Sequence, residues 1–179
     1  SPRRKELLQM LEVPFEVLVS DTKEVITKNE PAEVTKELSY QKAMAVAEQV
    51  EEGIIIGADT VVSIDGKILG KPADTEEARE MIYKLQGKSH MVYTGVTVIA
   101  KSGDMVSASS FAEGTKVNVA PMTENEIEAY ISTDEPYDKA GAYGIQGLFG
   151  KFIEGIKGDY FNVVGLPVHR LYEELKKFD

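Results

Sequence analysis

The stretch GIIIGADTVVSIDGKILGKP, residues 53–72, decides the fold more than any other part of the chain. Residues 54–64 are mostly β-branched and apolar, which predicts a buried strand. Asp65-Gly66 is a typical hairpin turn, so residues 67–69 are expected to return beside that strand. Because a tight hairpin joins antiparallel strands, the sheet is predicted not to be purely parallel.

Helical and strand patterns alternate on both sides of this hairpin. The strongest helical pattern covers residues 32–52 and is followed by Gly53. Shorter helices are predicted over residues 2–12, 75–85, 123–132 and 166–178, and further strands over residues 15–19, 91–100 and 107–119. The sequence therefore predicts an α/β fold, with a mixed twisted sheet and flanking helices, in a single domain over residues 1–179.

Composition limits the functions that are open to the chain. Its 179 residues are 42% hydrophobic and 28% charged, as in an ordinary globular protein. The absence of cysteine excludes thiolate chemistry, and the apolar runs are too short to cross a bilayer. We therefore expect a cytoplasmic protein with no membrane association. The net charge of −10 disfavours binding to long nucleic acid, but a local basic cluster can still bind a small anion.

An acidic residue, Asp59, interrupts the apolar strand. A buried carboxylate is costly unless it is paired or binds a metal, so Asp59 is either a salt-bridged structural residue or a metal ligand or general base. A carboxylate that emerges from a buried strand favours the functional alternative. Lys71 follows the return strand, so the hairpin brings it back toward Asp59, where a lysine can bind phosphate. The alternative for Lys71 is an ordinary surface lysine.

Three other sites carry basic or amide side chains. Lys42 lies beside the alanine-rich face of the strongest helix, where it either binds a ligand or extends a buried stem to solvent. Arg3 and Arg4 stand at a helix N-terminus, which makes them an anion site or a solvated basic patch. Residues 140–147 contain three glycines, which allow close approach to a ligand or simply a tight loop. Within that loop, Gln146 offers both donor and acceptor groups.

Several common catalytic patterns are missing from the sequence. His90 and His169 lack the spacing of metal ligands and are interpreted as structural. The glycine-rich loop lacks the lysine and hydroxyl of a phosphate-binding P-loop, and the chain has no G-x-S-x-G motif. No residue is therefore predicted to act as a covalent nucleophile.

Taken together, these segments resemble the Maf family of nucleotide pyrophosphatases. The matching stretches, in order, are Ser1–Leu8, Gln41–Ala43, Gly57–Thr60, Gly70–Pro72, Asp138–Gly147, Gly158–Tyr160 and Val164–Pro167. The resemblance implies a fold like that of inosine triphosphate pyrophosphatases, with two lobes and a central cleft. It also implies a homodimer and cleavage of nucleoside triphosphates between the α- and β-phosphates with Mg²⁺ or Mn²⁺.

The resemblance also implies roles for particular residues. Asp59 corresponds to the proton acceptor and a metal ligand, and Glu24 to a second carboxylate that can hold the metal. Lys42 and Lys71 correspond to catalytic phosphate ligands. The implied substrate-binding residues are Ser1, Arg3, Arg4, Thr60 and Gln146. The sequence Gly-Ile-Gln-Gly around Gln146 resembles the family branch that acts on dTTP and UTP, with a house-cleaning role.

A second hypothesis is a non-catalytic nucleotide-binding regulator of cell division. Glycine loops and basic residues would serve either function. Asp59 and Lys71 favour the enzyme, because a carboxylate beside bound phosphates repels them unless a metal is present.

Overall fold

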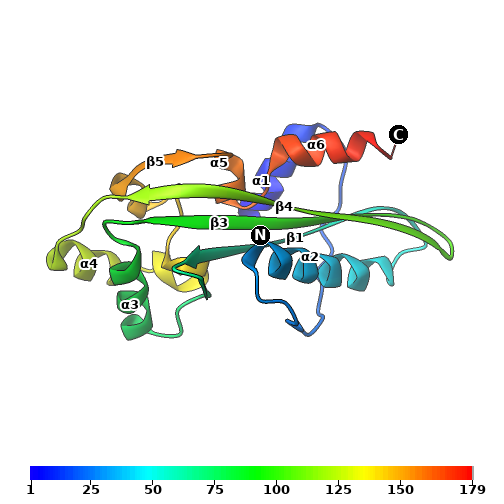
Figure 1. The fold of residues 1–179 in the computed structure, drawn as a ribbon. Coiled ribbons are helices and arrows are strands. Elements are labelled where there is room, and N and C mark those ends of the chain that lie inside the picture. The colour runs from blue at the N-terminus through cyan, green and yellow to red at the C-terminus, as the bar shows by residue number, and fades with distance from the viewer. Residues whose placement is uncertain (179) are drawn as a thin grey trace. The chain divides into compact units, whose positions relative to one another are not determined.

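The computed structural model describes residues 1–178 and has a mixed α/β fold (Figure 1). Its five-stranded antiparallel sheet has the order β2-β1-β3-β4-β5. The strands are β1 Glu52–Ile64, β2 Lys67–Leu69, β3 Ser89–Ser102, β4 Met105–Val119 and β5 Ile153–Lys157. The α-helices are α1 Pro2–Leu8, α2 Pro31–Ala47, α3 Thr75–Leu85, α4 Glu124–Ile131, α5 Tyr160–Val164 and α6 Val168–Lys176. Four 3₁₀ helices complete the described residues: η1 Gln9–Leu11, η2 Glu135–Asp138, η3 Ala140–Ala142 and η4 Leu148–Phe152. The expected α/β class with flanking helices is confirmed.

The hairpin that was predicted from residues 53–72 is present. β1 and β2 pair antiparallel, with Val62 opposite Leu69 and Ile64 opposite Lys67. Asp65 and Gly66 have φ angles of 50° and 77°, which suit a tight turn between right-handed twisted strands. The hairpin leads the chain directly from the strand of Asp59 to the segment of Lys71.

The chain forms two compact units. Unit 1 contains Ser1–Thr60, Thr94–Glu113 and the C-terminal segment from Gly165, and unit 2 contains Val61–Tyr93 and Gly114–Val164. The long strands β1, β3 and β4 each contribute residues to both units. No helix in the described residues is long and apolar enough to span a membrane.

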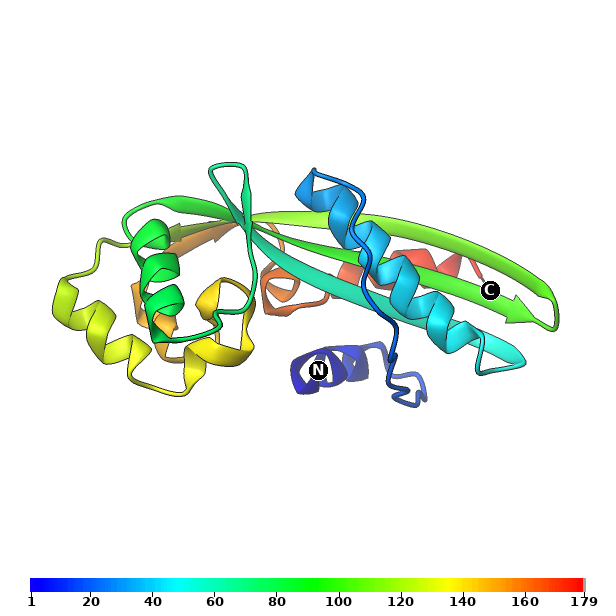
Figure 2. The ribbon, with the colours of Figure 1, turned by 90° about the horizontal axis from the view of Figure 1, so that it is seen from below.

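In unit 1, α2 packs closely on the sheet because two glycines face it. Figure 2 shows α2 lying along this part of β1 and β3. A Cβ at Gly57 would lie 2.5 Å from the Ser39 carbonyl oxygen, and a Cβ at Gly95 would lie 2.3 Å from the Thr35 carbonyl. The Ser39 hydroxyl is buried there and lies 2.8 Å from the Thr97 hydroxyl. Small side chains on both elements therefore set the distance between α2 and the sheet.

Unit 2 has its own core, which contains aromatic side chains from the glycine-rich loop and from η4. Phe149 is fully buried and contacts the rings of Tyr130, Tyr143 and Phe152, at centroid distances of 5.1, 4.8 and 5.6 Å. Because Tyr143 and Phe149 lie on either side of Gln146, burial of these rings fixes both ends of the loop segment that carries it.

Two local predictions were wrong. Residues 15–19 form no strand, and residues 12–29 have no regular secondary structure. Val17 and Val19 are 61% and 81% exposed, so this segment has the side chains of a strand but no buried face to fix it against a sheet. The helix predicted over residues 32–52 was also too long, since α2 ends at Ala47 and Glu52 is the first residue of β1.

Candidate active site

Asp59 and Lys42 form an ion pair in unit 1. The Lys42 Nζ lies 2.6 Å from Asp59 Oδ1, and Asp59 is only 9% exposed. Gly57 and Asp59 are two residues apart on β1, so they share the face that α2 covers. The close approach of α2 at Gly57 therefore places Lys42, one residue before Ala43, over the carboxylate. The charge of Lys42 offsets the cost of burying Asp59.

Glu24 joins the same cluster from the segment before α2. Its Oε1 lies 3.5 Å from Lys42 Nζ, so one ammonium group contacts two carboxylates. The Gln41 side chain anchors this segment: its Oε1 accepts the Val25 N–H at 3.0 Å, and its Nε2 donates to the Val25 carbonyl at 2.7 Å. These two bonds resemble one step of a β-ladder, and they hold the residue next to Glu24.

A second anchor holds the same segment from the preceding turn of α2. The Glu37 carboxylate accepts the Thr27 N–H at 3.0 Å and also the Thr27 hydroxyl. The hydroxyl bond lowers the pKa of Glu37 below its ordinary value. Sequence reasoning missed both anchors. Gln41 stood in a quoted motif without a role, and Glu37 looked like any exposed helical glutamate.

Arg4 is held rigidly in unit 1. Its Nε donates to the Gly165 carbonyl at 2.8 Å, and its Nη2 donates to the Thr60 hydroxyl at 2.8 Å. Thr60 Oγ1 in turn lies 2.8 Å from Thr94 Oγ1. Burial lowers the pKa of Arg4 and Asp59 raises it, and an arginine stays charged under such shifts. Arg4 thus keeps N–H donors for a further anion, beside the residue that follows Asp59.

The remaining predicted residues are placed but less constrained. Ser1 caps α1, with its hydroxyl 3.4 Å from the Arg4 N–H. The side chains of Arg3, Lys71 and Gln146 form no hydrogen bond or ion pair with other residues in positions 1–178. Lys71 and Gln146 are exposed and belong to unit 2. The structure therefore brings Ser1, Arg4, Glu24, Lys42, Asp59 and Thr60 into one connected cluster, with Arg3 adjoining it in sequence.

In unit 2, a backbone hydrogen bond joins the two predicted ligand-binding segments. The Gly141 N–H donates to the Gly70 carbonyl at 3.1 Å. Gly141 has a φ of 71°, and a Cβ there would lie 2.9 Å from a methyl group of Val62. Glycine is needed at this position both for conformation and for space. The loop of Gln146 is thus connected directly to the turn of Lys71.

The oxygen donors of the cluster suit a hard divalent cation. Asp59 and Glu24 both point at the position of Lys42 Nζ. Residues 1–178 contain no group of three or more His, Cys, Asp or Glu side chains arranged for a metal. Mg²⁺ commonly uses one or two carboxylates and completes its shell with substrate phosphates and water. Asp59 and Glu24 fit that pattern of one or two carboxylates.

His90 has the structural role that its sequence context predicted. It is 3% exposed in unit 2, and its Nε2 bonds to the Tyr143 hydroxyl. Burial lowers the pKa of His90 to about 4, so the imidazole is neutral near pH 7. This neutral pair ties β3 to the glycine-rich loop.

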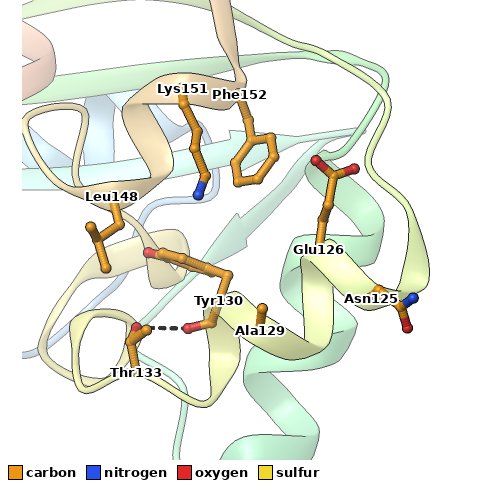
Figure 3. A pocket seen from close by; sticks show the side chains of 8 residues that line it. All are labelled: Asn125, Glu126, Ala129, Tyr130, Thr133, Leu148, Lys151 and Phe152. Atoms are coloured by element: carbon orange, nitrogen blue, oxygen red, sulfur yellow. Dashed lines mark hydrogen bonds between the residues drawn. The ribbon is translucent and has the colours of Figure 1, made fainter.

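Unit 2 also contains a pocket of about 270 Å³, shown in Figure 3. It lies between α4 and η4 and is lined by Asn125, Glu126, Ala129, Tyr130, Thr133, Leu148, Lys151 and Phe152. None of these is a predicted site residue, and the lining is mostly apolar. The pocket is therefore not a candidate for triphosphate binding.

The fold and the cluster define a class: an α/β protein in which two carboxylates, a lysine and an arginine lie together in one cluster. The family model for the Maf-like protein matches residues 1–178. A dTTP/UTP pyrophosphatase of Bacillus cytotoxicus is 53% identical, over 100% of this chain and 92% of the relative. A dTTP/UTP pyrophosphatase of Bacillus cereus strain AH187 is 50% identical over the same shares. The chain belongs to the Maf family, which confirms the resemblance inferred from its motifs.

Proposed function

We propose that the protein hydrolyses dTTP and UTP to the nucleoside monophosphate and pyrophosphate, with Mg²⁺ or Mn²⁺ as cofactor. The observation that carries the proposal is the buried Asp59–Lys42 pair, with Arg4 held by the adjacent Thr60. The names of the relatives at about half identity over the full chain support the choice of substrate and reaction.

In this proposal, Asp59 orients a water molecule and accepts its proton. Lys42 donates a hydrogen bond to Asp59 at 2.6 Å, and a further N–H of its ammonium group can bind a phosphate oxygen. Arg4, Lys42 and Lys71 neutralise the negative charge that grows on the departing pyrophosphate. A divalent metal held by Asp59 and Glu24 would add Lewis-acid stabilisation of the same charge.

Gln146 is proposed to read the base. Its side chain is exposed and unpartnered within residues 1–178, on a loop whose backbone is anchored. An amide can form two hydrogen bonds with the alternating acceptor and donor groups of a uracil or thymine edge. Cytosine presents a different pattern at position four, so an amide held in the orientation that suits uracil would face mismatched groups. We therefore propose a preference for dTTP and UTP over CTP.

Hydrolysis of a panel of nucleoside triphosphates with Mg²⁺ tests the reaction. We expect dTTP and UTP to yield the monophosphate and pyrophosphate, resolved by anion-exchange chromatography. Primary release of a diphosphate and free phosphate would show that the wrong bond was assigned. Tight nucleotide binding without turnover would instead favour the non-catalytic regulator.

Substitution of Gln146 tests the choice of base. In Gln146→Ala and Gln146→Glu, we expect the ratio of kcat/KM for dTTP to that for CTP to fall about tenfold, more than total activity falls. Gln49→Ala, at an exposed glutamine of unit 1, is the matched control and should leave the ratio unchanged. If both Gln146 variants keep the full preference, this side chain does not read the base.

A further inference from the structure

We propose that Glu135 is a specificity-positioning residue, whose carboxylate fixes the loop that presents Gln146 to the base. The inference rests on the proposed function, because it assigns a role within that base-reading site. Glu135 begins η2, is partly buried and lies in unit 2 with Gln146. It touches no reacting group in this proposal and acts only through the loop.

Both oxygens of the Glu135 carboxylate bind the backbone just after Gln146. The Leu148 N–H donates to Oε1 at 2.7 Å, and the Phe149 N–H donates to Oε2 at 3.2 Å. Hydrogen bonds to an ionised acceptor are roughly twice as strong as those between neutral groups. Because Phe149 is also fully buried, the chain is fixed two and three residues beyond the glutamine.

Gly147 makes this contact sterically feasible. A Cβ at Gly147 would lie 2.1 Å from Glu135 Oε1 and 2.5 Å from its carboxyl carbon. The backbone of Gly147 has a φ of −96°, which other residues adopt readily. Glycine is therefore needed here for the space that the carboxylate occupies and not for its conformation.

The end of α4 holds Glu135 in place. The Thr133 hydroxyl donates to the Tyr130 carbonyl at 2.7 Å, the bond drawn in Figure 3. The same hydroxyl lies 3.4 Å from the Glu135 N–H. The Tyr130 hydroxyl donates to the Ala142 carbonyl at 2.8 Å. Burial raises the pKa of Tyr130, and the nearby Glu135 carboxylate raises it further. Glu135 is thus attached to a helix that also binds the other end of the loop.

Separate contacts hold the chain before Gln146. Gly141 is bonded to Gly70, and Tyr143 to His90. Gln146 therefore lies between two anchored segments, residues 141–143 and residues 148–149. Its own side chain has no partner in residues 1–178, so its direction follows from the backbone, which the two anchors and the Gly147 N–H bond to the Gly144 carbonyl hold.

Steady-state kinetics of Glu135→Gln test the proposal. The amide keeps the size of the side chain but offers one acceptor oxygen, and its NH₂ group opposes the other backbone N–H. We expect KM for dTTP to rise about tenfold and the dTTP-to-CTP ratio of kcat/KM to fall about tenfold, with kcat nearly unchanged. Glu154→Gln, at an exposed position of β5, is the matched control.

Gly147→Ala provides an independent second variant. Its Cβ should displace the carboxylate and cause the same loss of selectivity, although Glu135 is intact. In a Glu135→Ala background the methyl group meets no carboxylate, so the double variant should match Glu135→Ala within about twofold. Losses that multiply would show that Gly147 acts without Glu135 and would overturn the proposal.

The outcomes also separate this proposal from the proposed function. If wild type prefers dTTP over CTP and Glu135→Gln keeps that preference, even with a lowered melting temperature, Glu135 is only structural and the inference fails alone. If wild type shows no such preference, the base-reading function fails and the inference fails with it. Loss of the preference in Glu135→Gln, with Glu154→Gln unchanged, supports both.

Discussion

The two units hold their predicted functional residues in different ways. In unit 1, Asp59, Lys42 and Arg4 are held by other side chains or by carbonyl groups within the cluster. In unit 2, Lys71 and Gln146 have side chains that are free within residues 1–178, and it is the backbone around them that is anchored. In unit 1 the contacts thus fix the charged side chains themselves, whereas in unit 2 they fix the backbone that carries Lys71, proposed to bind phosphate, and Gln146, proposed to read the base.

The largest expected effect breaks the charge cluster of unit 1. In Asp59→Asn we expect kcat for dTTP to fall roughly 10³-fold, because the amide cannot accept the proton of the attacking water. Asparagine has nearly the same shape, so circular dichroism should show an intact fold. Asp65→Asn in the β1–β2 turn is the control and should retain full activity. Near-normal turnover by a folded Asp59→Asn protein would contradict the assignment.

A second prediction addresses an anchor of unit 2. Burial lowers the pKa of His90 from 6.5 to about 4, so the unfolded chain takes up the proton at a higher pH than the folded chain. The contribution of His90 to the free energy of unfolding should therefore be fully present above pH 6.5 and should be lost as the pH falls toward 4. This contribution is about 3 kcal/mol.

Denaturant titrations between pH 7 and 4 measure that decline. His90→Gln should show a shallower loss of stability than wild type over this interval. His169→Gln, at an exposed position of α6, should follow the wild-type curve. Identical slopes for wild type and His90→Gln would mean that the buried imidazole does not remain neutral on folding.

The smallest expected effect concerns the segment that brings Glu24 to the cluster. Gln41→Ala removes both hydrogen bonds to Val25, so Glu24 should spend less time near Lys42. We expect the Mg²⁺ concentration for half-maximal activity to rise about fivefold, less than the roughly 10–100-fold typical of losing an outer-shell partner, because Gln41 bonds to the residue next to Glu24 and not to Glu24 itself. Mn²⁺ binding measured by electron paramagnetic resonance should weaken in parallel. An unchanged metal affinity would show that Glu24 is not held there for a metal.

Much of the fold could be predicted because local chemistry and tertiary contacts agree. The β1–β2 hairpin follows from an apolar run and an Asp-Gly turn, and the helix predicted over residues 123–132 is present as α4, where Thr123 and Glu126 form a capping box. The course of residues 24–27 could not be predicted, because it depends on the bonds of Gln41 to Val25 and of Glu37 to Thr27 and not on a local pattern.

The candidate site was predictable in identity more than in arrangement. An aspartate in an apolar strand, a lysine beside alanines and a glycine-rich loop are local signals, and they pointed to Asp59, Lys42 and Gln146. The role of Thr60 in holding Arg4 joins residues that are 56 positions apart in the chain. That contact exists only once the fold is formed. The metal, the homodimer and the cytoplasmic location stay predictions.

The bond from the Gly141 N–H to the Gly70 carbonyl has a consequence for how selectivity can change. Both of its atoms are backbone atoms, so no change of side chain at position 146 removes it. If Gln146 reads the base as proposed, residue 146 can be varied to accept another base while the turn that carries Lys71 keeps its attachment to the loop. Substitution of Gly141 itself is the exception, because its φ of 71° and its contact with Val62 exclude a side chain. Within this loop, the position proposed to read the base is open to mutation, and the backbone link to the turn of Lys71 is not.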